Sequence, residues 1–105
     1  MWIPPDAIIA PDKIRRYLLI PRLIDDKSRY LARAGFDQST ATELEIAIRK
    51  VTAENDAIVE RVNEHGTYYN VHGLLTGPNA MVLPVMLVWL QRLDGAFSFV
   101  TLIPD

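Results

Sequence analysis

The sequence predicts an α+β domain in which two to three N-terminal helices pack on a four-stranded antiparallel meander sheet. Apolar residues recur at helical spacing in the first half of the chain, the period changes to two after about residue 55, and turn signals separate four extended segments. Helices that precede a run of strands are typical of α+β domains. The chain has 105 residues, half of them hydrophobic, so a single domain spanning 1–105 is expected.

The first helix is expected to begin at Pro11 and to end before Pro21. Proline suits the first helical position, and Asp12 complements the positive end of the helix dipole. Pro21 disfavours helix at the residue before it and cannot donate to the helix ladder. One face carries the apolar residues Ile14, Tyr17 and Leu18.

The second helix is short and is expected to begin at Asp25 or Asp26, either of which can cap its N-terminus. Gly35 supplies the left-handed residue that ends it, and Phe36 can fold back onto the last turn. Its buried stripe consists of Tyr30, Leu31 and Ala34.

The third helix has the clearest pattern in the chain. Thr40 and Glu43 have the spacing of a capping box, in which each side chain accepts from a free amide of the first turn. The apolar residues then recur at i, i+3, i+4 and i+7, namely Leu44, Ala47, Ile48 and Val51.

Four strands are expected over 57–62, 67–76, 82–90 and 97–103. Turn signals lie between them at 64–66, 77–80 and 93–96. The third strand is apolar on both faces, because Val85, Leu87 and Trp89 alternate with Met86, Val88 and Leu90. The helices are expected to cover one face, and the other is a candidate surface for a partner or a second copy. Pro84 is expected near an edge or a bulge.

Composition excludes several classes of protein. The chain has no cysteine, which removes disulfides and thiol-based sites and favours a reducing, cytoplasmic compartment. No signal peptide and no membrane-spanning stretch is recognisable.

Residues 1–33 hold seven of the eleven basic groups and four acids, although the whole chain has a net charge of −2. This cationic part suits RNA or an acidic partner, or it is a solvated helix surface.

The candidate site residues lie on one strand and between two helices. His72 is expected to share a strand face with Tyr68 and Asn70, which suits RNA cleavage or is the solvated side of the strand. Lys27 is suited to contact phosphate, or it is a counter-charge beside a helix cap. In a metal-independent ribonuclease, His72 would be the base, Tyr68 the acid and Lys27 the cation that stabilises the phosphorane. No cofactor or metal is expected, because neither histidine belongs to a metal-binding motif.

Eight short segments of the chain form a distinctive combination: IIAPDKI at 8–14, YLL at 17–19, DDKS at 25–28, AGF at 34–36, GTYY at 66–69, GLLTGPN at 73–79, VW at 88–89 and FVTLIPD at 99–105. Together they resemble an uncharacterised bacterial family, the DUF6883-like domains of unknown function. Such domains occur alone or as C-terminal modules of toxin-like and phage-related proteins. The stand-alone form is often encoded beside a small β-rich partner, which implies a toxin–antitoxin-like system.

The chain departs from this family at positions that similar sequences fill with basic residues. It has Pro84, Met86 and Ser98 there, and Leu87 where threonine is usual. Fewer cations weaken phosphate binding and favour protein contact. Two hypotheses follow: an RNA-cleaving toxin with a small antitoxin-like partner, or a non-catalytic module that binds protein or forms a homodimer. The residues expected to contact RNA or the partner are Arg29, Arg33, Met86 and Trp89.

Overall fold

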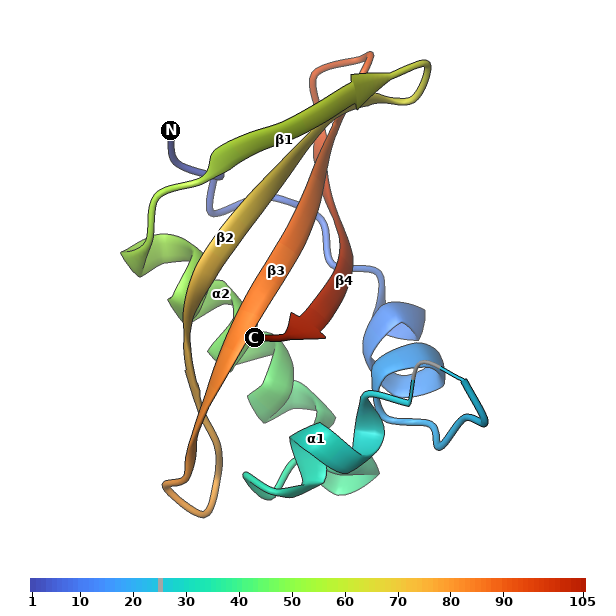
Figure 1. Ribbon diagram of the computed structural model, residues 1–105, viewed down its shortest axis with the longest axis vertical. Helices are drawn as coiled ribbons and strands as arrows, with labels where there is room; N and C mark the ends of the chain where they lie inside the picture. The colour runs from blue at the N-terminus through green and yellow to red at the C-terminus, as the bar shows by residue number, and fades with distance from the viewer. Residues whose placement is uncertain (25) are drawn as a thin grey trace.

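The computed structural model describes residues 1–24 and 26–105, and it confirms the α+β class (Figure 1). The helical elements are the π-helix η1 (Lys13–Leu18), α1 (Ser28–Ala32), the 3₁₀-helix η2 (Gln38–Thr40) and α2 (Ala41–Glu54). The strands are β1 (Ile58–Asn63), β2 (Gly66–Thr76), β3 (Val82–Arg92) and β4 (Phe97–Pro104). No helix in the described ranges has the length and apolar character needed to cross a membrane.

The four strands form one antiparallel meander in the order β1-β2-β3-β4, and α2 covers one of its faces (Figure 1). The core lies between that face and the helices. Leu44 and Ile48 of α2 are fully buried there, and burying each side chain stabilises the fold by about 2 kcal/mol. The sheet contributes the fully buried residues Val71, Leu75, Val85, Leu87, Trp89 and Leu102.

The two apolar faces of the third strand are covered to different extents. Leu87 and Trp89 belong to the core. Val88 points the other way and is only 7% exposed, yet it lies outside the core cluster. Its neighbours Met86 and Leu90 are half-buried. The second face is therefore covered only in part by the chain itself.

Pro84 lies in a central strand and pairs with Leu74 in regular register, so no bulge forms there, but it has no strand partner on its β4 side and is locally at an edge. Proline is tolerated because the pairing with β4 begins only at Val85. The carbonyl of Pro84 accepts from the amide of Asp105 at 3.1 Å and from the hydroxyl of Tyr30 at 2.5 Å.

The first helix begins at Pro11 and ends before Pro21 as expected, but most of it is π-helical. The amide of Leu19 donates to the carbonyl of Ile14 at 3.1 Å, which is the five-residue spacing of that helix type. Single π turns often occur at functional sites. This one carries Tyr17, whose surroundings are described below.

The second helix is confirmed, but its expected start is wrong: it begins at Ser28 with Lys27 in the N-cap position, and no described side chain caps it. The Asp26 carboxylate accepts from the Ser28 amide at 2.9 Å and from the Ser28 hydroxyl, while Asp25 lies outside the described residues. Gly35 has a φ of +91°, and the amide of Phe36 returns to the carbonyl of Leu31 at 3.2 Å.

The third helix begins where predicted, but the capping box lies three residues earlier. The Asp37 carboxylate accepts from the Ser39 amide at 2.8 Å, and the Thr40 hydroxyl accepts from the Asp37 amide at 2.8 Å. The box of Thr40 and Glu43 does not form, because the Thr40 side chain is occupied by this upstream turn.

Two glycines allow close approach between the helices and the sheet. A Cβ on Gly73 would lie 2.6 Å from a methyl group of Val51, so this glycine lets α2 pack directly on β2. A Cβ on Gly77 would lie 2.0 Å from the carbonyl oxygen of Ala34. Asn79 fixes the same contact, because its amide donates to the Ala34 carbonyl at 3.3 Å. The turn between β2 and β3 thereby covers the end of α1.

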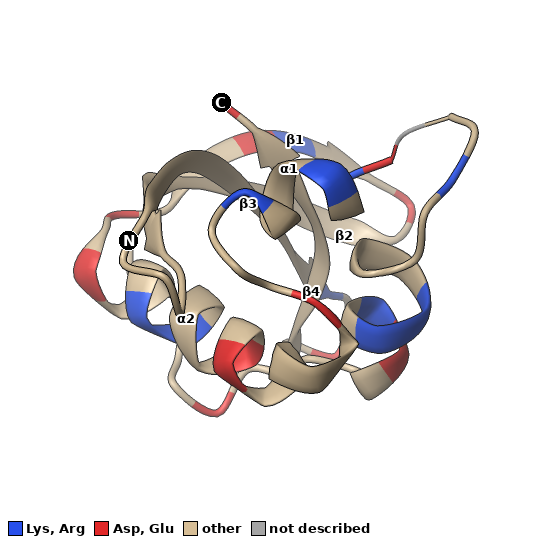
Figure 2. Ribbon diagram, turned by 90° about the horizontal axis from the view of Figure 1, so that it is seen from below, with Lys and Arg blue, Asp and Glu red and all other residues tan. Residues whose placement is uncertain are grey.

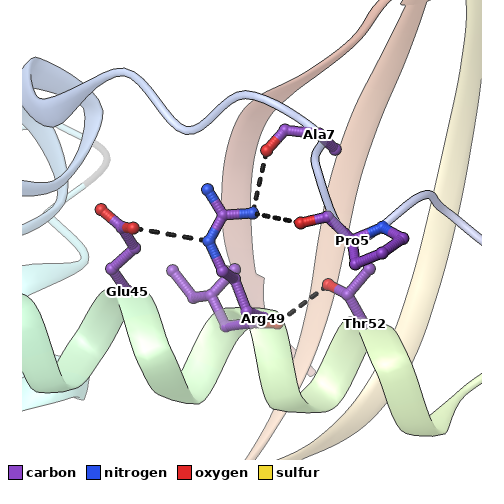
Figure 3. Close-up of polar contacts among 6 residues, drawn as sticks. Pro5, Ala7, Glu45, Arg49 and Thr52 are labelled. Carbon is purple, nitrogen blue, oxygen red and sulfur yellow. Dashed lines mark hydrogen bonds and ion pairs between the residues drawn. The ribbon is translucent and has the colours of Figure 1, made fainter.

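The N-terminal arm (residues 1–9) crosses behind the sheet from the side of β1 to the edge of β4 (Figure 1). Ile8 forms a parallel bridge with Ser98, so the arm covers part of the β4 edge. Arg49 of α2 holds the arm from the other side. Its guanidinium donates to the carbonyls of Pro5 at 3.3 Å and Ala7 at 2.8 Å and lies 3.4 Å from Glu45 (Figure 3).

Candidate nucleic-acid interface on the open sheet face

The strand register places the predicted polar residues together on the sheet face that points away from the core. We call this surface the open face. Tyr68, Asn70 and His72 of β2 lie opposite Leu90, Val88 and Met86 of β3. Partners across an antiparallel pair share a face, and none of these six residues belongs to the core cluster. The prediction that Tyr68, Asn70 and His72 share a strand face is thus confirmed.

His72 is held by a carboxylate from the end of β4. Its Nδ1 lies 2.8 Å from Oδ2 of Asp105, and both side chains are about half exposed. A carboxylate at one ring nitrogen fixes the tautomer, so Nδ1 carries the hydrogen and Nε2 keeps its lone pair when the ring is neutral. The pair therefore has the arrangement of an oriented general base.

Lys27 is the most buried charged residue among those described, with 8% exposure. Its ammonium donates to the Tyr17 hydroxyl at 2.9 Å and to the Thr101 hydroxyl at 3.1 Å. Thr101 is the β4 partner of Val88, so it belongs to the open face. A lysine this buried needs polar partners, and two hydroxyls from different elements supply them.

Further cations gather around the ring of Tyr17. The distances from its centroid are 5.0 Å to the Lys27 ammonium, 5.0 Å to the Arg22 guanidinium and 5.9 Å to the Lys13 ammonium. We call Lys13, Arg22 and Lys27 with Tyr17 the cation cluster. Figure 2 shows Lys and Arg gathered on α1 and the neighbouring helical segment. Three cations at one ring create a local positive potential that attracts an anion.

The cation cluster and His72 lie on the same face but do not touch. His72 on β2 and Thr101 on β4 are separated by two inter-strand spacings across the sheet and by two residues along the strand. With strands about 4.8 Å apart and a rise of about 3.3 Å per residue, their Cα atoms are roughly 12 Å apart. Met86 and Val88 of β3 lie between them, so an apolar strip separates the two polar groups.

Asn70 lies between Tyr68 and His72 and carries an unused acceptor. Its Oδ1 is buried and has no hydrogen-bond partner among the described residues. An unpaired buried polar atom costs free energy and calls for an explanation, such as a ligand group that donates to it.

The model of the family DUF6883, a domain of unknown function, matches residues 5–105. The chain belongs to this family. One chain of a contact-dependent growth inhibition toxin–immunity protein complex from Klebsiella pneumoniae 342 has the same fold. The TM-score is 0.68 with 16% identity, over 94% of this chain and all of that one. No curated protein matches the sequence significantly.

The remaining candidates of this DUF6883 domain are dispersed. The Tyr68 ring lies against the Arg61 guanidinium, 4.0 Å from its centroid. Arg29 is exposed, 3.8 Å from the Asp26 carboxylate, and Arg33 lies over the Tyr30 ring at 5.6 Å. Met86 is on the open face and half-buried.

The expectation that Trp89 contacts RNA or the partner on the open face is wrong. It is fully buried on the helix side of the sheet, because strand alternation turns it away from the face that carries Met86 and Val88. No partner on the open face can reach it.

Sequence reasoning missed Tyr17, Arg22, Thr101 and Asp105. The position of Tyr17 in the sequence predicts the apolar face of its helix. That pattern contains no signal for a contact between the Tyr17 hydroxyl and Lys27. Asp105 follows the last strand and becomes a partner of His72 only through the sheet register. Among the described residues, no group of three His, Cys, Asp or Glu side chains could hold a metal ion.

Proposed function

We propose that this DUF6883 domain is a metal-independent ribonuclease of a toxin system and that a small partner protein neutralises it. The observation that carries the proposal is the position of Lys27. Its ammonium lies between the hydroxyls of Tyr17 and Thr101, at the β4 side of the face that also presents His72. Phosphate is the ligand that a cluster of cations and hydroxyls on an open sheet face suits best.

His72 supplies the base. With Asp105 at Nδ1, the free Nε2 takes the proton from a ribose 2′-hydroxyl. The resulting oxyanion attacks the adjacent phosphorus, the bond to the 5′-oxygen breaks, and a 2′,3′-cyclic phosphate forms. The leaving oxygen takes its proton from an acid. Tyr68 lies four residues from His72 on the same strand face, about 13 Å along β2 between Cα atoms. At that distance it does not serve the same phosphate, and a water molecule supplies this proton.

The separation of about 12 Å between His72 and Thr101 changes the role of Lys27. The cation cluster holds a phosphate beside the cleaved one and thereby orients the strand, instead of stabilising the phosphorane. The apolar strip of Met86 and Val88 between the two groups suits the faces of unpaired bases.

Family resemblance points to the same surface. Similar sequences carry basic residues where this chain has Pro84, Met86 and Ser98. These three lie opposite Leu74, His72 and Leu90 respectively, so all belong to the open face. Loss of those cations leaves the cation cluster as the main phosphate contact of this member. The fold neighbour comes from a toxin–immunity protein complex, which supports a toxin system with a protein partner.

The test is expression of the chain without its genomic neighbour, followed by cleavage of a labelled single-stranded RNA in the presence of EDTA. Growth arrest and products ending in a 2′,3′-cyclic phosphate are expected, and His72→Ala and Lys27→Met should relieve both. Arg16→Met is the matched control, because Arg16 is an exposed cation paired with Asp12. Harmless expression together with intact RNA contradicts the proposal.

A second candidate function is a protein-binding or homodimerising module without catalysis. It is favoured by β1, a sheet edge whose apolar residues Ile58, Val59 and Val62 are 56–70% exposed. Exposed apolar edges pair readily with another strand. Light scattering of the purified chain, alone and with the neighbouring gene product, separates a monomer from either complex.

A further inference from the structure

A large pocket lies on the helix side of the molecule, away from the open face. It is formed between the N-terminal arm and α2, has a volume of about 550 Å³, and has Trp89 of β3 in its lining. Small-molecule sites in proteins commonly span about 300–1,000 Å³. The pocket is separate from the residues assigned to RNA, so it goes beyond the proposed function.

The lining is almost entirely apolar. Trp2 and Ile46 line the pocket and are 59% and 62% exposed, and Pro4 and Ala53 add to its walls. A large exposed indole and an exposed isoleucine are unfavourable in water, so a ligand that covers them gains binding free energy from the apolar surface it buries. The body of a ligand for this site is therefore apolar, and the indole favours a ring.

The walls are fixed in place before any ligand binds. Arg49 of α2 donates to the carbonyls of Pro5 and Ala7 and so holds the arm against the helix (Figure 3). Thr52, also in the lining, donates its hydroxyl hydrogen to the carbonyl of Ile48 at 2.8 Å. These polar groups are already satisfied, so they hold the shape of the pocket and do not compete for a ligand.

One donor at the pocket has no acceptor among the described residues. Lys50 lines the pocket, is exposed, and forms no ion pair there. A ligand that brings an acceptor and negative charge satisfies this donor, whereas one that brings a further donor does not.

We propose that this pocket binds a small aromatic carboxylic acid. The ring lies between Trp2 and Ile46, and the carboxylate pairs with the ammonium of Lys50. An ammonium ligand is disfavoured, because Lys50 contributes a positive charge to the lining, whereas the charge of Arg49 is paired with Glu45.

The chain itself carries the reporter for the test. Its two tryptophans, Trp2 and Trp89, both line the pocket, so intrinsic fluorescence reports on the site alone. The probes are 4-phenylbutyrate and 4-phenylbutan-1-ol, which share the ring and differ in charge. Saturable binding is expected for both, and the carboxylate should bind about two- to fivefold more tightly than the alcohol.

Two variants locate the binding. Lys50→Met should reduce the affinity for 4-phenylbutyrate to that for the alcohol. Ala53→Phe should abolish binding of both, because the new ring fills the pocket from an exposed helix position. Ala32→Phe, at an exposed position of α1, is the control and should bind like the parent chain. Thermal melts confirm that each variant is folded.

Three results overturn the proposal: no saturable fluorescence change at millimolar probe, equal affinity of the two probes, or a signal that survives Ala53→Phe. RNA cleavage by Lys50→Met and Ala53→Phe is expected to equal that of the parent. A failure here therefore leaves the ribonuclease proposal standing.

Discussion

The ammonium of Lys27 lies 2.9 Å from the hydroxyl of Tyr17, and both meet the hydroxyl of Thr101 on β4. This contact joins the helical segment before α1 to the last strand of the sheet. It places the buried cation beside the open face, where an anion can reach it. The predictions below test this site and the fold that positions it.

Lys27→Met should remove phosphate affinity at small cost in stability. Methionine fills a similar volume, and the two hydroxyls left behind are 3.5 Å apart and can pair with each other. RNA affinity should fall by about tenfold or more, and the free energy of unfolding by about 1 kcal/mol. Filter binding at two salt concentrations and urea denaturation measure the two effects. An unchanged salt slope for RNA binding would show that Lys27 contacts no phosphate.

Asp105→Asn should lower RNA cleavage without weakening RNA binding. An amide at Nδ1 of His72 can either donate or accept, so it no longer fixes the tautomer that leaves Nε2 free. The turnover rate should fall by at least about tenfold, while the affinity for uncleaved RNA stays the same. Single-turnover kinetics separate the two quantities. Equal turnover in the variant and the parent excludes an oriented base at His72.

Gly77→Ala should destabilise the fold strongly. The added Cβ would lie 2.0 Å from the carbonyl oxygen of Ala34, and backbone atoms cannot yield as a flexible side chain does. A loss of about 3 kcal/mol or more is expected. Gly95→Ala is the comparison: its Cβ meets nothing within 4 Å, so only the φ of +90° opposes it. That variant should lose about 1 kcal/mol. Urea midpoints rank the two.

Met86→Lys and Leu87→Lys should differ sharply although the residues are neighbours. Met86 is half-buried on the open face, so the lysine ammonium reaches water and the fold persists, with a loss within about 1 kcal/mol. Leu87 is fully buried in the core, and a charge there should cost about 4 kcal/mol or more. Circular dichroism melts test both. Unfolding of Met86→Lys would show that the open face is part of the core.

Asp37 makes the start of α2 sensitive to acid. Hydrogen bonds from the Ser39 hydroxyl and amide lower the pKa of Asp37 below its ordinary value of 3.8. The folded state thus holds its proton less tightly than the unfolded chain. The stabilisation is complete above pH 3.8 and is lost as the pH falls through the lowered pKa. Asp37→Asn should therefore show a smaller loss of stability than the parent between pH 5 and 3. Urea midpoints across this range measure it, with Asp6→Asn as the control.

The alternation of side chains along a strand accounts for most of what could be predicted about the candidate site. The alternation of Tyr68, Asn70 and His72 is readable in the sequence, because the side-chain period of a strand is two. The opposing residues of β3 are equally apolar on both faces, so the sequence did not say which face the helices cover. The burial of Trp89 and the partial exposure of Met86 followed only from packing.

Local signals failed where a side chain had two competing partners. Thr40 stands where the sequence predicts a helix cap, yet its hydroxyl accepts from the amide of Asp37, because the preceding turn forms its own capping box. Pro84 suggests an edge, yet it lies in a central strand, where it is tolerated because the pairing of β3 with β4 begins one residue later, at Val85. In both cases the deciding contact comes from a neighbouring segment whose position the local pattern does not contain.

The sequence by itself determined the fold class, the order of helices and strands, the main turns and the family. These follow from hydrophobic period and from glycine and proline positions, which act over a few residues. Only the tertiary structure brought Tyr17, Lys27 and Thr101 together, placed Asp105 against His72 and opened a pocket between the arm and α2. Such contacts join segments far apart in the chain, and their geometry is fixed by packing of the helices on the sheet and by strand register.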